Sequence, residues 1–298
     1  MASNSIRESD ERGRAFGIAG AGRVARSLGK LLSDQGQEVV AVASRKLSRA
    51  ETAAAFIGSG AQAVSYAELP SKAKNILIAV SDDAIEAIAK ILATDLKGGV
   101  VLHTSGIYGP DVLAPLTEQG NSCAGIHPLQ TIASPEQGLD KLPGSTFSIA
   151  GSGKAAEWAE QLVHLLKGEI VRIVPGRKPV YHAAAVMASN YIVALIDAAV
   201  QVMGTAGVES DSARRALAPL IEASVENALK CPGEALTGPV QRGDVKTLKL
   251  HLQGLASLPP SIDQLYRSLG IHAVQVARQQ GLENTEADQL EQLLRETK

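Results

Sequence analysis

The chain has 298 residues, which is enough for one large domain or two of ordinary size. Hydrophobic residues make up 45% of it, which indicates a globular protein with a sizeable core. A formal net charge of −2 gives no reason to expect a nucleic acid or an anionic membrane as a partner. Cys123 and Cys231 form no C-x-x-C pair and the histidines show no metal-ligand spacing, so we expect a cytoplasmic protein without a metal site.

A glycine-rich turn near the start of the chain carries the strongest pattern. Residues 15–19 are typical of a buried strand and residues 23–32 of an amphipathic helix. The turn between them reads G-x-G-x-x-A, which suits a tight turn, close approach of a pyrophosphate and close packing of helix on strand. The residues predicted to bind a dinucleotide here are Gly20, Ala21, Gly22, Arg23 and Val24.

The end of the second predicted strand indicates which dinucleotide is bound. The apolar run 38–43 is followed by Ser44, Arg45 and Lys46. An acidic residue at this position would bind the ribose 2′-hydroxyl, whereas a hydroxyl and two cations suit a 2′-phosphate. Ser44 and Arg45 are therefore predicted to bind NADP, although solvated loop cations would give the same pattern.

Strand and helix patterns alternate from residue 15 to about residue 174. Such alternation predicts an α/β fold of the Rossmann type with a mostly parallel sheet. The further patterns in this half are helices at 48–56, 84–92 and 154–166, and strands at 61–64, 75–80, 99–103, 146–150 and 169–173.

The carboxyl ends of these strands supply further candidate residues. Val80 and Ser81 are predicted to contact the cofactor, and Asp82 or Asp83 to cap the following helix. Strand 99–103 leads into His103 and Ser105, which we also predict beside the cofactor.

A second loop, predicted at residues 125–131, contains His127, a candidate proton donor because the pKa of histidine lies near neutrality. The alternative for both His103 and His127 is that the imidazole only fixes a loop by hydrogen bonding.

The pattern changes after a linker at residues 175–179. The following patterns are helices at 180–203, 210–229, 245–253, 260–280 and 285–296. We therefore predict a tail at 1–14, an NADP-binding Rossmann domain at 15–175 and an all-helical substrate and dimerisation domain at 176–298. The substrate is expected in a cleft between the two domains.

Two stretches of the helical half carry candidate residues for chemistry. Helix 180–203, which we expect to be buried, contains the polar residues His182, Ser189 and Asn190, whose burial costs free energy unless they are bonded or line a site. In the loop before residue 245, Thr237 could cap a helix or bind a ligand, and Arg242 could bind a substrate carboxylate. A turn between two helices would use the same glycines and proline. Asp244 is expected to cap the next helix.

These motifs resemble a family of Rossmann-like proteins whose helical C-terminal half is catalogued as a domain of unknown function. The motifs are His103-Thr-Ser-Gly106, Gly125-Ile-His-Pro-Leu-Gln130, Tyr181-His-Ala-Ala-Ala185 through Ser189-Asn190, and Leu236-Thr-Gly-Pro239 with Arg242-Gly-Asp244. The build is similar to that of pyrroline-5-carboxylate reductase, 6-phosphogluconate dehydrogenase and ketopantoate reductase. The resemblance implies NADP-linked hydride transfer, a small carboxylic acid substrate and a homodimer joined through the helical halves.

One position departs from those relatives. Asn190 matches their helix asparagine, but the lysine that serves them as general acid four residues earlier is here Val186. We therefore predict His182 as the proton donor, with Asn190, Ser189 and His127 as further catalytic candidates. Water or a fixed hydroxyl remains an alternative donor.

The expected function is NADP-dependent reduction of a small carbonyl or imine compound, such as a 2-oxo acid of the ketopantoate type. The alternative is an NADP-binding sensor or scaffold without turnover.

Overall fold

The computed structural model describes residues 15–58 and 60–296. The chain divides into two units between Ser189 and Asn190, and each is described by itself. This division lies later in the chain than the predicted boundary at residues 175–176. The predicted tail at 1–14 lies outside the described residues.

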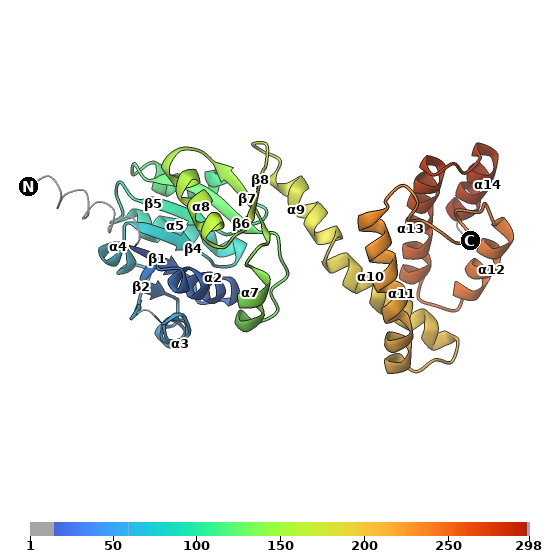
Figure 1. The fold of residues 1–298 in the computed structure, drawn as a ribbon, viewed down its shortest axis with the longest axis horizontal. Coiled ribbons are helices and arrows are strands. Elements are labelled where there is room, and N and C mark those ends of the chain that lie inside the picture. Colours follow the sequence, from blue (N-terminus) through green and yellow to red (C-terminus); the bar gives the residue numbers. More distant parts are fainter. Residues whose placement is uncertain (1–14, 59, 297–298) are drawn as a thin grey trace, which may run out of the picture. The chain divides into compact units, whose positions relative to one another are not determined.

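The first unit contains a sheet of eight strands among the described residues, in the order β3-β2-β1-β4-β5-β6-β7-β8 (Figure 1). The strands are β1 (Ala15–Ala19), β2 (Glu38–Ala43), β3 (Gln62–Val64), β4 (Asn75–Ile78), β5 (Val100–His103), β6 (Ser122–Pro128), β7 (Thr146–Gly151) and β8 (Glu169–Arg172). All neighbouring pairs are parallel except β6 and β7, which are antiparallel. The predicted mostly parallel α/β fold is thus confirmed.

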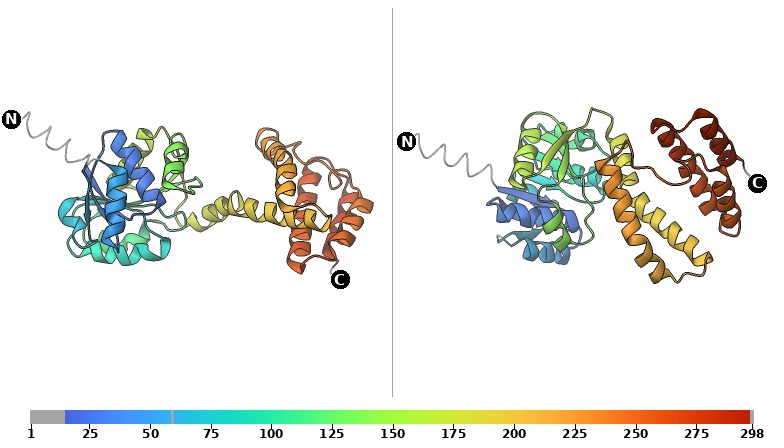
Figure 2. Two further views of the ribbon diagram at one scale, coloured as in Figure 1. Left: turned by 90° about the horizontal axis from the view of Figure 1, so that it is seen from below. Right: turned by 45° about the vertical axis from the view of Figure 1, so that its right-hand side comes forward.

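Helices cover both faces of this sheet because its strands are apolar on both sides (Figure 2). Phe16 and Ile18 of β1 point into one core and Ala19 into the other. The helices of this unit are α2 (Arg23–Asp34), α3 (Leu47–Ile57), α4 (Leu69–Lys72), α5 (Ile85–Ala93), α6 (Ala114–Thr117), α7 (Pro135–Lys141), α8 (Gly153–Leu165) and α9 (Lys178–Met187), with 3-10 turns η1 (Asp82–Ala84) and η2 (Pro110–Leu113).

The predicted loop at residues 125–131 is wrong, because residues 122–128 form strand β6. Its side chains are a mixture of small, polar and apolar types, so it lacks the continuous apolar run used to recognise the other strands. Pairing with β5 on one side and β7 on the other satisfies its backbone and makes it a strand.

The predicted single helix at 180–203 is interrupted. Helix α9 ends at Met187 and α10 (Asn190–Thr205) begins at Asn190. Between them the Ser189 hydroxyl donates a hydrogen bond to the Ala185 carbonyl over 2.7 Å, and the Ser189 amide bonds to Val186. Serine back-bonding of this kind bends helices.

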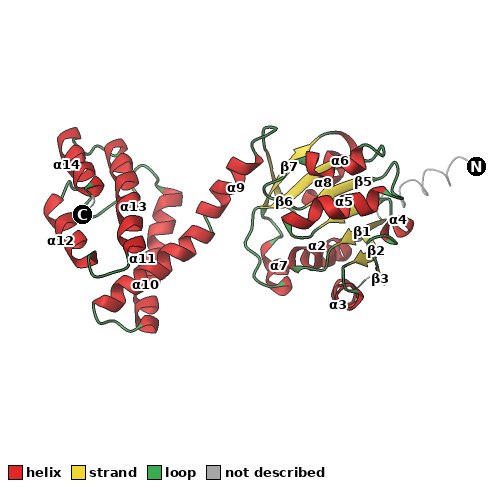
Figure 3. Cartoon of the chain, turned by 180° about the vertical axis from the view of Figure 1, so that it is seen from behind, coloured by secondary structure: helices red, strands yellow, loops and turns green. Residues whose placement is uncertain are grey.

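In the described part of the second unit every regular element is a helix (Figure 3). The helices are α10, α11 (Ser210–Lys230), α12 (Val245–Leu255), α13 (Pro260–Gln279) and α14 (Asn284–Arg295). Helices α12, α13 and α14 share an apolar core that includes Leu248, Val274 and Leu290. As predicted, Asp244 caps α12 by accepting a hydrogen bond from the Thr247 amide at 3.0 Å.

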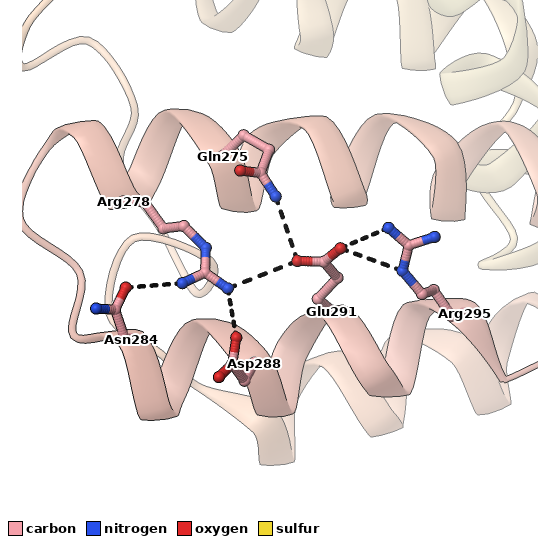
Figure 4. Close-up of polar contacts among 6 residues, drawn as sticks. All are labelled: Gln275, Arg278, Asn284, Asp288, Glu291 and Arg295. Atoms are coloured by element: carbon pink, nitrogen blue, oxygen red, sulfur yellow. Dashed lines mark hydrogen bonds and ion pairs between the residues drawn. The ribbon is translucent and has the colours of Figure 1, made fainter.

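Polar contacts join α13 to α14 on the outside of that core (Figure 4). Arg278 pairs with Asp288 over 2.6 Å and with Glu291 over 3.6 Å. Glu291 in turn binds Arg295 on its own helix, and Gln275 donates to Glu291 across the pair. These contacts lie at the surface, so each is expected to contribute little to the stability of the unit.

Helix α10 is more exposed than expected for so apolar a segment. Within the stretch Lys178–Thr205 a window of 18 residues has a mean hydropathy of 1.7, which by length and composition alone is enough to cross a membrane. Within α10 the buried residues are Ala198 and Val200, whereas Tyr191 and Val193 are 62% and 69% exposed. The predicted burial of this helix is therefore wrong for the chain taken alone.

Candidate functional site

A cavity of about 1270 Å³ lies in the first unit where β1, β2 and β4 end. In an open α/β sheet the carboxyl ends of the strands form the usual binding crevice. This volume exceeds the roughly 300–1,000 Å³ of pockets that hold drug-sized ligands, so the cavity suits a long ligand such as a dinucleotide. Of the predicted cofactor residues, those that line it are Gly20, Ala21, Gly22, Arg23, Val24, Ser44, Arg45, Val80 and Ser81.

The glycine turn between β1 and α2 keeps side chains out of the part of the cavity that lies beside it. Gly20 has a φ of +138°, and a Cβ there would lie 2.1 Å from the Ala79 carbonyl oxygen, so a larger residue is excluded. A Cβ at Gly22 would meet no described atom within 4 Å. No described side chain caps α2, so its first amide groups remain available to a ligand phosphate.

Cations dominate this end of the cavity. Its lining includes Arg23, Arg26, Arg45, Lys46 and Arg49. Against these five cations the lining contains one acid, Asp82 of η1. The excess of positive charge suits a ligand with several negative charges, such as the pyrophosphate and 2′-phosphate of NADP.

The aspartates after β4 do not cap a helix as predicted. The residues preceding η1 and α5 are Ser81 and Ala84, and neither helix start has a side-chain cap in the described chain. Because η1 forms a 3-10 turn before α5, the aspartates lie inside the first turn instead of at the cap position. The Asp82 carboxylate is thereby left to face the cavity.

Two histidines from distant parts of the chain meet at the far end of the cavity. His127 comes from β6 and His182 from α9, with ring centroids 6.0 Å apart in an edge-to-face arrangement. Both face Gly106: a Cβ there would lie 2.5 Å from His182 Nδ1 and 2.9 Å from His127 Nε2. The glycine therefore lets both imidazoles pack closely against the loop after β5, where any side chain would displace them.

His182 Nδ1 is buried and has no hydrogen-bond partner in the described structure. Buried polar atoms are normally paired, so this nitrogen, which lies close to Gly106, is a polar atom whose hydrogen bond the described side chains leave unmade. The prediction had singled out both histidines, and the structure brings them together.

A buried lysine behind the histidines was missed by the sequence analysis. Lys178 is 3% exposed, and its Nζ donates a hydrogen bond to Ser148 Oγ over 3.1 Å. The same ammonium lies 5.2 Å from the centre of the Tyr181 ring. The Tyr181 hydroxyl is 2.9 Å from His127 Nδ1, which connects the lysine to the cavity wall.

Burial and this lysine determine the charge states of the site. Burial, followed by the charge of Lys178, lowers the pKa of His127 to about 3, so His127 is neutral at physiological pH. Burial lowers the pKa of Lys178 to about 8, while the Asp82 carboxylate acts in the opposite direction. Lys178 is thus still protonated at pH 7 but is a much stronger acid than a surface lysine.

His103 and Ser105, predicted beside the cofactor, do not line the cavity. His103 is fully buried; its Nδ1 accepts from the Ser105 amide at 3.2 Å and its Nε2 lies 3.1 Å from the Gly109 carbonyl oxygen. The Ser105 hydroxyl accepts hydrogen bonds from the amides of Ile107 and Tyr108. Both side chains fix the loop after β5, and the neighbours Thr104 and Gly106 reach the cavity in their place.

The remaining predicted residues lie elsewhere. Ser189 uses its hydroxyl within the helix turn described above, and Asn190 is the exposed first residue of α10 in the second unit. Thr237 and Arg242 are exposed in the loop between α11 and α12. Gly238 and Gly243 give this loop its turns through φ values of +89° and +67°.

Two family models match the chain, one in its N-terminal half and one in its C-terminal half. Residues 3–128 match the Rossmann-like domain, and residues 145–273 match a domain of unknown function, DUF2520. Comparison with curated protein sequences finds no match.

Solved structures share this fold at low sequence identity. A Bacteroides fragilis protein described as a proposed NADP oxidoreductase is 22% identical with a TM-score of 0.70, covering 90% of this chain and 99% of its own. Pyrroline carboxylate reductase from Plasmodium falciparum with NADP bound is 12% identical with a TM-score of 0.59, covering 94% and 97%. The reductive aminase of Aspergillus terreus in complex with NADPH and ethyl-5-oxohexanoate is 14% identical with a TM-score of 0.58, covering 94% and 92%.

Proposed function

We propose that this chain, which joins a Rossmann-like domain to a DUF2520 domain, is an NADP-dependent oxidoreductase that reduces a small carbonyl or imine compound. One observation carries the proposal. A single cavity extends from a cation-lined helix start to a pair of imidazoles, one of which has an unpaired buried nitrogen. A phosphate-rich cofactor suits the first end, and a reacting C=O or C=N group suits the second.

The lining residues fit NADP in their chemistry. Gly20 to Val24 and the start of α2 would hold the pyrophosphate, and Ser44 and Arg45 the 2′-phosphate. Val80, Ser81, Thr104 and Gly106 would lie along the nicotinamide half. When bound, NADPH supplies the hydride; the protein supplies orientation and a proton.

The substrate would be small and carry a carboxylate, as a 2-oxo acid of the ketopantoate type does. His127 takes the place of the predicted His182 as proposed proton donor because its Nδ1 contacts Tyr181, and His182 becomes the proposed hydrogen-bond partner of the reacting group. Asn190, Ser189, Thr237 and Arg242 stay predicted substrate residues.

We also propose that the chain is a cytoplasmic homodimer, joined through the helical unit. Support comes from the exposed apolar side chains of α10 and α11, among them Tyr191, Val193, Leu220 and Leu229. The unpaired cysteines Cys123 and Cys231 fit a reducing compartment. Val193→Glu should convert the dimer to a monomer in sedimentation analysis, whereas a monomeric wild-type protein would refute the interface.

The function is tested first by cofactor binding and then by turnover. NADPH should bind with micromolar or better affinity by calorimetry, and NADH more weakly. NADPH oxidation would then be measured with a panel of 2-oxo acids, simple ketones and cyclic imines. Tight NADPH binding without reduction of any compound in the panel would favour the alternative, a cofactor-binding sensor.

A further inference from the structure

We propose that Lys178 is the source of the proton in this reaction, and that Ser148, Tyr181 and His127 carry the proton from it to the cavity. The inference rests on the proposed function. It gives the role of the relatives' lysine, whose position is Val186 here, to Lys178, which would reach the reacting group through neighbouring side chains.

The four side chains lie next to one another. The Lys178 ammonium donates to Ser148 Oγ at 3.1 Å, and the neighbouring Ser148 hydroxyl opposes the rise that burial causes in the pKa of Tyr181. The Tyr181 oxygen is 2.9 Å from His127 Nδ1. The other nitrogen of that ring, Nε2, faces Gly106 at the cavity wall. The path thus begins at a buried charge and ends where a ligand can be contacted.

Two structural elements hold these residues together. Ser148 and His127 are paired in the antiparallel ladder between β7 and β6, so their side chains lie on the same face of the sheet. Lys178 and Tyr181 are three residues apart on α9, which places them on one side of that helix.

The hydrogen bonds of the path can all be oriented in one direction, from Lys178 toward the cavity. In that arrangement His127 carries its proton on Nε2 and accepts from Tyr181 at Nδ1. The oxygen or nitrogen of the substrate group that is reduced would take the Nε2 proton of His127. Nδ1 takes the proton of Tyr181, Tyr181 that of Ser148, and Ser148 one from Lys178. Each residue except Lys178 regains the charge it had, and Lys178 becomes a neutral amine that is later reprotonated from solvent.

The surroundings of Lys178 suit a proton donor. Asp82 from η1 favours its charged form, while His103 from β5 and His127 from β6 are kept neutral by burial and by the lysine itself. The face of the Tyr181 ring also favours the cation. Burial nevertheless weakens its hold on the proton, as the pKa of about 8 shows.

Three single substitutions interrupt the path at different points: Tyr181→Phe, Ser148→Ala and Lys178→Met. Each should lower kcat by about 10²-fold or more, in the range lost with a general acid, while the Kd for NADPH stays within twofold. Tyr266→Phe is the matched control, because Tyr266 makes a similar contact with His251, at 2.8 Å, in the second unit. It should leave kcat unchanged.

The pH dependence separates proton supply from a structural role. Wild-type kcat should fall as the pH rises through about 8, because Lys178 must be protonated to donate, and this fall should be absent from Lys178→Met. Variants that match wild-type kcat, or a Lys178→Met variant that keeps the same fall, would overturn the proton path. A wild-type enzyme that reduces no compound in the panel would instead refute the proposed function.

A measurement in the resting protein decides the direction of the path without turnover. Nitrogen-15 NMR of the histidine rings should find His127 protonated on Nε2, and Tyr181→Phe should abolish this preference. A His127 protonated on Nδ1 would overturn the proposal, because the Tyr181 hydroxyl could then not donate to it.

Discussion

Replacing Lys178 by methionine should make the first unit more stable at neutral pH, although it removes the proposed proton source. The side chain is 3% exposed, and burial lowers its pKa from 10.5 to about 8. At about 1.36 kcal/mol per pKa unit, this lowering corresponds to about 3.4 kcal/mol of unfavourable free energy for the charged form. The lost hydrogen bond to Ser148, about 1 kcal/mol, and residual solvent screening offset part of it, so we expect a gain of about 1–2 kcal/mol.

The gain should depend on pH in a definite direction. The folded protein loses the Lys178 proton at about pH 8 and the unfolded chain at about 10.5, so the penalty is complete below pH 8 and disappears as the pH approaches 10.5. Lys178→Met should therefore be more stable than wild type at pH 7 and no more stable than wild type at pH 10.5.

Urea unfolding, followed by the fluorescence of Trp158, measures this difference. Trp158 is the single tryptophan of the chain and is buried in α8, with its ring 5.8 Å from that of Phe16, so it reports on the first unit. A variant that is less stable than wild type at pH 7, or a gain that is the same at pH 7 and 10.5, would refute the reasoning.

Three further substitutions test other parts of the molecule. Arg45→Ala should weaken NADPH binding by about 1–3 kcal/mol and barely affect NADH, measured by calorimetry; equal losses would exclude a 2′-phosphate contact. Gly106→Ala should lower kcat/KM at least tenfold, since its Cβ would lie 2.5 Å from His182 Nδ1; unchanged kinetics would show that the site lies elsewhere. Arg267→Met should destabilise the helical unit by about 2–4 kcal/mol in thermal unfolding, because Arg267 binds Asp263 and the carbonyl groups that end α14; a change below about 0.5 kcal/mol would contradict this.

Local patterns in the sequence were sufficient to predict the cofactor end of the cavity. Gly20, Gly22 and Arg45 directly follow strands that are recognised by their continuous apolar runs. Their position at the edge of the sheet therefore follows from the order of the elements. The bounds of α11, α12, α13 and α14 also lie within a few residues of those predicted, because caps and prolines mark them.

The proton path could not be predicted because it depends on a reversal of strand direction. In a parallel sheet only the carboxyl ends of strands reach the binding edge, but β7 runs the other way and brings Ser148, near its beginning, opposite His127. Lys178 lies in a stretch of glycine, proline and cations that is typical of an exposed linker. Its burial comes from tertiary packing, for which the sequence gives no local signal.

For His103 the prediction was wrong in the opposite way, because a residue that fixes a loop was taken for one that contacts the cofactor. Its position after a strand end is that of a functional residue, and only the hydrogen bonds to Ser105 and Gly109 show that it fixes a loop. The expected burial of α10 was also wrong. Hydropathy indicates that the side chains of a helix are apolar, but it does not indicate which part of the protein, if any, covers them.

The distribution of charge along the cavity has a consequence for how the protein responds to salt. One end is lined by five cations, whereas the imidazole of His127 at the other end is neutral. Added salt screens the first end strongly and has little charge to screen at the second. Ionic strength should therefore weaken the binding of a polyphosphate ligand while leaving contacts at the histidines almost unchanged, so that one solution variable separates the two halves of a single cavity.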